Sequence, residues 1–253
     1  MKQPSASLAR LLRDLTGRHD LWSVWSDFVE MAAIAISNAV DWAQRDGREA
    51  RYLRIAEKYD ATERTRFCEA FASLVTTFEE TGHDDILGRT FMELELGSKW
   101  AGQFFTPFHL CRLMAELHVD DTMRATIAER GYVTASDPAV GAGAMPIALA
   151  AAMHAAGINY QQHLHVTAQD IDERAAHMCY VQLSMFGVPA IVVVGDTLRM
   201  EERARWYTPL HITGGWRWKL QRAAEPPAPA TGEPKTDPVA APDAPQLSLF
   251  EVP

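Results

Sequence analysis

The sequence lacks the features that mark several large protein classes. Its three cysteines, Cys68, Cys111 and Cys179, are odd in number and far apart, so they indicate neither a disulfide framework nor a zinc site. The apolar runs are too short to span a bilayer, and the first residues lack the charged-then-apolar order of a signal peptide. We therefore expect a cytoplasmic protein that has no membrane partner.

The chain also lacks an excess of basic residues. It has 24 Lys and Arg against 33 Asp and Glu, which gives a formal net charge of −9 over 253 residues. Overall charge therefore does not attract nucleic acid, and a nucleic-acid partner would need a local basic patch or other subunits. At 47% apolar and 23% charged, the composition is that of a folded globular protein.

The apolar pattern of residues 1–100 predicts a helical domain. Apolar side chains between Phe67 and Phe78 recur with helical spacing, and Asp60 followed by Glu63 is a capping signal for that helix. A second helix is expected over residues 27–43. We interpret the tryptophans in or beside these segments as core residues of a small bundle; they are Trp22, Trp25 and Trp42.

Residues 101–222 alternate between strands and helices. Short β-type runs occupy residues 132–136, 165–169 and 190–194, and helical stretches separate them. This order is half of a doubly wound α/β domain. After Leu198 the pattern fades, and no fourth strand is expected.

The stretch of residues 200–222 mixes tryptophan with arginine and lysine. Such a mixture can grip phosphates and stack on bases. We favour the alternative that its three tryptophans patch the sheet, because Glu201 and Glu202 dilute the positive charge. These tryptophans are Trp206, Trp216 and Trp218.

Aspartates end all three expected strands, at Asp137, Asp170 and Asp196. In an open α/β sheet, ligands bind at the carboxyl ends of the strands. Asp170 could accept ribose hydroxyls and Asp196 an adenine amino group, but each could also be a helix cap or turn residue. After the first strand, Gly141 and Gly143 would let the backbone approach a ligand, although a third glycine of a dinucleotide motif is missing.

Two motifs, in this order, resemble those of the N6-adenine DNA methylases related to the modification subunits of type I restriction systems. They are Gly102-Gln103-Phe104-Phe105-Thr106-Pro107 and Asp137-Pro138-Ala139-Val140-Gly141-Ala142-Gly143. The resemblance extends from the helical N-terminus to about Leu198. It implies a Rossmann-like S-adenosylmethionine methyltransferase fold, with S-adenosylmethionine as cofactor and DNA as the partner in DNA modification.

The resemblance also implies which residues bind the cofactor: Phe105, Thr106 and Pro107 at its methionine end, Asp137, Ala139, Gly141 and Gly143 around the amino acid and sulfonium, and Asp170, Ile171 and Asp196 at the ribose and adenine. Thr106 is a natural cap and Pro107 a natural first residue for the helix that follows. That helix is expected to be amphipathic and to carry Leu110, Leu113, Met114 and Leu117.

The family's Asn-Pro-Pro-Phe motif, which holds the target adenine, is missing from this chain. We therefore expect a truncated methyltransferase domain with no catalytic residue of its own, and whether the chain alone is an enzyme stays open. Its first strand would lie at an open sheet edge. We expect residues 210–213, the N-terminal helices, a second copy or a partner chain to cover that edge.

Residues 223–253 hold most of the 14 prolines and predict a disordered tail. Near its end, a short peptide resembles the motif by which bacterial proteins dock on the DNA polymerase sliding clamp, and its contact residues would be Gln246, Leu247, Leu249 and Phe250. A non-enzymatic adaptor that binds the clamp is therefore an alternative function.

An unrelated small-molecule methyltransferase is a second alternative. A metal site at His163 and His165 is not expected, because a third ligand is lacking.

Overall fold

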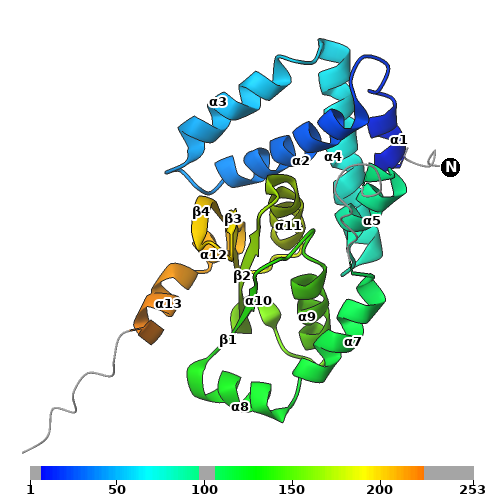
Figure 1. The fold of residues 1–253 in the computed structure, drawn as a ribbon. Helices are drawn as coiled ribbons and strands as arrows, with labels where there is room; N and C mark the ends of the chain where they lie inside the picture. The colour runs from blue at the N-terminus through cyan, green and yellow to red at the C-terminus, as the bar shows by residue number, and fades with distance from the viewer. Residues whose placement is uncertain (1–6, 97–105, 225–253) are drawn as a thin grey trace, which may run out of the picture.

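The computed structural model describes residues 7–96 and 106–224, and it begins with a group of helices (Figure 1). The longest helix, α4, starts with the capping box predicted at Asp60 and Glu63, whose side chains bond each other's backbone N–H groups. The second helix begins six residues earlier than expected, because Asp20 caps it by accepting from the N–H of Ser23. These helices are α1 (Leu8–Arg13), α2 (Leu21–Asn38), α3 (Arg45–Ala56), α4 (Ala61–Thr81) and α5 (Ile86–Glu93).

A four-stranded sheet follows, in the spatial order β1-β2-β3-β4. The three expected strands are present and parallel; they are β1 (Val133–Asp137), β2 (Leu164–Asp170) and β3 (Ala190–Asp196). The expectation of only three strands is wrong, because β4 (Glu201–Tyr207) pairs antiparallel with β3. Its only buried side chain is Trp206, so the strand has no apolar alternation that could have revealed it. The protein is thus a mixed α/β structure.

Helices cover the two faces of the sheet unequally. The remaining helices are α7 (Phe108–His118), α8 (Asp121–Arg130), α9 (Ala144–Ala155), α10 (Tyr160–His163), α11 (Glu173–Met185), α12 (Pro209–Thr213) and α13 (Trp216–Ala224). Of these, α9 and α11 pack on one face, and α7 packs outside α9. On the other face, the rings of His165 and Trp216 are in contact at a centroid distance of 5.3 Å, and this packing leaves Thr167 exposed.

The core is continuous between the N-terminal helices and the sheet. Helix α2 packs along α11, and buried apolar side chains of both regions form one cluster. Trp25 lies fully buried in it, as expected, and Trp22 is half-buried against Phe91. The expectation for Trp42 is wrong, because 72% of its surface is exposed just beyond the end of α2.

The tryptophans after residue 200 also divide into two groups. Trp206 and Trp216 are buried at 4% and 0% exposure and patch the sheet as expected. Trp218 does not, because the opposite side of α13 carries it and 66% of its surface is exposed.

Candidate functional site

The carboxyl ends of β1, β2 and β3 bring the predicted acidic residues together at one edge of the sheet. Asp137 and Asp170 end β1 and β2, and Asp196 ends β3. Two hydrogen bonds tie these ends to one another: the N–H of Gly141 donates to Asp170 Oδ2 at 2.8 Å, and the hydroxyl of Thr197 donates to the carbonyl of Pro138 at 2.8 Å. The three loops therefore form one connected surface.

Asp170 is the most buried of the three, at 8% exposure. Its Oδ2 accepts from Gly141, and its Oδ1 accepts from the N–H of Asp172 at 2.8 Å. Burial raises the pKa of Asp170, although the two backbone N–H groups oppose the shift. A carboxylate can accept about four hydrogen bonds, so each oxygen retains capacity for one further donor.

Asp137 and Asp196 both serve as turn residues. Asp137 Oδ1 accepts from the N–H of Ala139 at 3.1 Å. Asp196 Oδ1 accepts from the N–H groups of Leu198 and Arg199, at 2.9 and 3.2 Å. Both aspartates thus have the turn role that the sequence left open, and the turn hydrogen bonds use one carboxylate oxygen of each.

Apolar surface lies directly beside the acidic groups. Ile171 follows Asp170 and is 60% exposed, which is unusual for a residue that sits between a buried strand and a capped helix. The backbone carbonyl of Ile171 accepts a hydrogen bond from the guanidinium of Arg203 on β4, so the unpredicted strand helps to hold this residue in place.

The glycine turn has the conformation that the sequence predicts. Gly141 and Gly143 have φ values of 58° and 101°, in the region that favours glycine. A Cβ atom on Gly143 would lie 3.2 Å from the Sγ of Cys179 and 3.4 Å from its Cα, so the turn also packs closely on α11. Gly143 precedes α9 directly, and the turn therefore ends where the helix begins.

A buried hydrogen-bond network that sequence reasoning missed supports this turn. Gln182 on α11 is fully buried, and its Nε2 donates to the carbonyl of Ala142 and to Asp85 Oδ1, both at 2.8 Å. Its Oε1 accepts from the N–H of Leu87 at 3.0 Å. Asp85 caps α5 through the N–H of Gly88, and burial raises the pKa of its carboxyl. One side chain thus joins the helical region to the glycine turn.

The predicted methionine-end motif is only partly described. Phe105 lies outside the described residues, whereas Thr106 and Pro107 are exposed at the start of α7. The prediction that Thr106 caps this helix is wrong: Pro107, with φ −55° and ψ 131°, occupies the cap position and the helix begins at Phe108.

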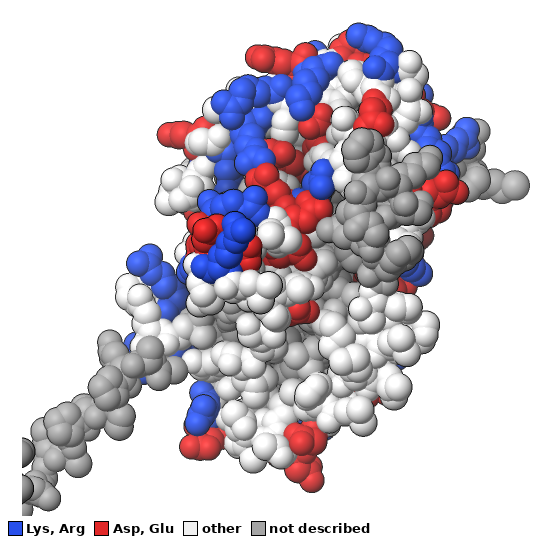
Figure 2. Space-filling view, in the orientation of Figure 1, with Lys and Arg blue, Asp and Glu red and all other residues white. Residues whose placement is uncertain are grey.

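Helix α7 is amphipathic, but its large apolar side chains point outward. Leu113 and Leu117 are 58% and 75% exposed, while Cys111 and Ala115 pack against α9. Small side chains on both helices permit this close approach. The surface over α7 accordingly shows few charged side chains (Figure 2).

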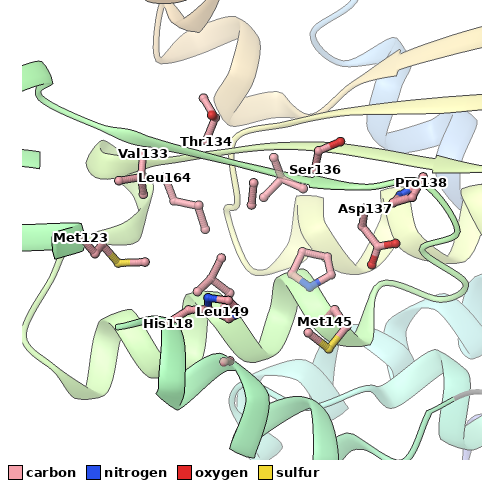
Figure 3. Close-up of a pocket in the computed structure, with 14 residues that line it drawn as sticks. His118, Met123, Val133, Thr134, Ser136, Asp137, Pro138, Met145, Leu149 and Leu164 are labelled. Carbon is pink, nitrogen blue, oxygen red and sulfur yellow. The ribbon is translucent and has the colours of Figure 1, made fainter. Parts of the chain in front are cut away.

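A groove of about 550 Å³ runs along the outer edge of β1 (Figure 3). All of β1 lines it, with Asp137 and Met145 at one end and Met123 at the other. Within the described part of the chain, no strand pairs with this edge. The expectation that residues 210–213 cover it is wrong, because they form α12, which packs against β3.

Comparison with known proteins assigns the region around this site. Residues 89–212 match the family described as N-6 DNA Methylase, a span that includes both predicted motifs and the ends of all three parallel strands. The part of the chain that carries the candidate site therefore resembles the N-6 DNA methylases. The family implies S-adenosylmethionine as the methyl donor. No functionally curated protein matches the sequence.

A solved structure is also similar to this chain: the type I restriction-modification system methyltransferase subunit from Streptococcus thermophilus, at 16% sequence identity and a TM-score of 0.40. The similarity covers 77% of this chain and 43% of that one. The chain therefore spans less than half the length of that subunit.

The other predicted sites stand as follows. Within residues 7–96 and 106–224, no group of three or more His, Cys, Asp or Glu side chains could hold a metal ion. His163 bonds the carbonyl of Gly131, and His165 bonds His211 at 2.9 Å. Every helix in the same described ranges is too short or too polar to cross a bilayer. The tail residues Gln246, Leu247, Leu249 and Phe250 lie outside the described residues.

Proposed function

We propose that this chain binds S-adenosylmethionine at the carboxyl ends of β1, β2 and β3 and acts in N6-adenine DNA modification. The observation that carries the proposal is the hydrogen bond between Gly141 and Asp170, which joins the glycine turn to the acidic end of β2 next to exposed Ile171 in the chain. The family match spans this whole arrangement. The sheet would then be the first half of a Rossmann-like methyltransferase domain.

The residues present suit the chemistry of this cofactor. Three carboxylates at one sheet edge favour a cationic sulfonium over an anionic pyrophosphate. The free acceptor capacity of Asp170 suits the ribose hydroxyls, and Ile171 offers apolar surface to an adenine ring. When bound, S-adenosylmethionine supplies an electrophilic methyl group. Asp196 would accept from the adenine amino group through Oδ2, which faces the Nε of Arg199 at 3.6 Å, because Oδ1 already accepts two N–H groups.

We propose that the target adenine is held by residues from outside this sequence. The family holds the adenine amino group with an Asn-Pro-Pro-Phe type of motif, and the only Pro-Pro pair here is Pro226-Pro227, which Glu225 precedes. The unpaired edge of β1 begins at the proposed cofactor site and is a suitable surface for a partner chain or a second copy. This chain would then supply cofactor binding and its partner the target base.

Calorimetric titration with S-adenosylmethionine tests the proposal. We expect the wild-type protein to bind and Asp170→Ala to lose binding. Ile171→Ala is the cleaner variant, because this exposed side chain can be shortened without disturbing the core, and we expect affinity to fall by about tenfold, corresponding to about 1.4 kcal/mol. Leu53→Ala on α3, with 52% exposure, is the matched control. Absence of binding by the wild type would overturn the assignment.

A second candidate function rests on the tail peptide Gln246-Leu247-Ser248-Leu249-Phe250. We propose that it docks on the DNA polymerase sliding clamp, with Leu249 and Phe250 in an apolar pocket and Gln246 setting the register. The chain would then act as an adaptor in DNA modification or replication. The two functions are compatible, because the peptide and the strand ends share no residues.

A further inference from the structure

A second groove lies at the opposite end of the sheet from the three aspartates. Its volume is about 630 Å³, and it runs between the segment that follows α2 and the helices α12 and α13. Ile191 and Tyr207, which pair at the start of β3, form part of its floor. Since a strand rises about 3.3 Å per residue, Ile191 lies about 16 Å from Asp196 at the other end. This surface is therefore separate from the proposed cofactor site.

Two exposed tryptophans line this groove. Trp42 comes from the segment after α2 and Trp218 from α13, and they are 72% and 66% exposed. Tryptophan normally buries most of its large surface. Trp216, two residues before Trp218 on the same helix, does so at 0% exposure. Two indole rings left open beside one groove need an explanation other than core packing.

Guanidinium groups accompany both rings. The Arg45 guanidinium carbon lies 5.0 Å from the centroid of the Trp42 ring, and that of Arg217 lies 6.0 Å from the Trp218 ring. Helix α13 has no acidic residue and carries two further basic ones, Lys219 and Arg222. Figure 2 shows this basic surface over α13.

The acidic groups at this groove are already neutralised. Asp41 is buried at 7% exposure and pairs with Arg48 at 2.8 Å. Glu202 pairs with Arg205, a lining residue, on β4. The charge left to attract a ligand is therefore positive, although the whole chain is acidic.

We propose that this groove binds single-stranded DNA, with bases stacked on Trp42 and Trp218 and phosphates held by Arg45 and Arg217. Exposed indole faces beside cationic side chains are the combination that recognises unpaired bases without sequence preference. A duplex keeps its bases stacked inside and cannot use the indoles. The site would hold a single-stranded segment of DNA that lies away from the reacting adenine. Its binding does not depend on the cofactor.

Fluorescence anisotropy of a labelled 20-nucleotide oligodeoxythymidylate, titrated with the full chain, tests the proposal. We expect Trp42→Ala and Trp218→Ala each to weaken binding by about 5- to 150-fold, and Trp218→Phe to retain most of it because a ring remains. Arg217→Gln should reduce the slope of log affinity against log salt by about 0.7. Leu117→Ala, which removes a 75% exposed apolar side chain on α7, should change nothing.

Four outcomes would overturn the proposal. They are the absence of binding, equal binding by both tryptophan-to-alanine variants and the wild type, equal affinity for a duplex of the same length, and equal or tighter binding of a 20-nucleotide oligouridylate. Quenching of tryptophan fluorescence by a peptide of residues 240–253, without quenching by the oligonucleotide, would also overturn it in favour of a peptide ligand. Failure of S-adenosylmethionine binding would leave it intact, because the two sites share no residues.

Discussion

Replacement of Gln182 should uncouple the glycine turn from the helical region. In the wild type its amide donates to Ala142 and Asp85 and accepts from Leu87, and the side chain has no exposed surface. Gln182→Leu keeps the approximate volume and removes all three hydrogen bonds. The N–H of Leu87 and the carbonyl of Ala142 then lose this partner in the core, whereas Asp85 keeps its bond from Gly88.

The expected cost follows from those unpaired groups. Each buried polar group left without a partner costs about 1 to 3 kcal/mol, so two groups cost about 2 to 6 kcal/mol of unfolding free energy. Natural domains are stable by only about 5 to 15 kcal/mol, so the variant should be marginal. Gln162→Leu, on the exposed surface of α10, is the matched control and should stay within about 0.5 kcal/mol of the wild type.

Gln182→Glu gives a sharper version of the same test. A carboxyl group at this position can donate to Asp85 or Ala142 only when it is protonated, so folding should raise its pKa. The stability of this variant relative to the wild type should then be highest below the pKa of a free glutamate and fall as pH rises through the folded value. Urea denaturation of both proteins at pH 5 and pH 8 measures this difference. A difference between variant and wild type that is equal at both pH values would refute the network.

Two further predictions concern a buried histidine and the tail. Burial, helped by the positive charges of Arg51 and Arg48, lowers the pKa of His177 to about 3. Acidification below pH 6.5 should therefore destabilise the fold, because the unfolded chain takes up a proton there, and this group alone should cost about 2 kcal/mol of unfolding free energy between pH 7.5 and pH 5. The urea midpoint of His177→Leu should decline less steeply over this pH range than that of the wild type. Leu249→Ala combined with Phe250→Ala should abolish pull-down of the sliding clamp, and unchanged pull-down would exclude that partner.

Local sequence signals were sufficient for much of the α/β region. The three parallel strands could be predicted because each is a short β-type run that ends at aspartate. The capping box could be predicted because Asp60 and Glu63 lie within one helical turn. The strand β4 could not be predicted, because only Trp206 is buried and the sheet edge, not an apolar pattern, stabilises the segment. The predicted cap of α7, Thr106, lies one residue before the observed cap, because the backbone of Pro107 is extended and the helix begins only at Phe108.

Long-range contacts decided the rest. Gln182 and Asp85 are 97 residues apart, and nothing local to either shows that they bond each other beneath the glycine turn. The sequence predicted both Trp25 and Trp42 as core residues of the helical bundle. Trp42 is exposed because α2 ends at Asn38, before it. Likewise, the pairing of α7 with α9 through small side chains turns the leucines of α7 outward.

The sequence by itself determined the resemblance to the N-6 DNA methylases, the order of the three parallel strands and the acidic residue at the end of each, because these depend on residues that are close in the chain. Tertiary structure alone decided which polar groups meet in the core, that a fourth strand pairs with β3, and which tryptophans remain exposed. Those outcomes depend on how helices and strands pack, and burial is a property of the assembled fold.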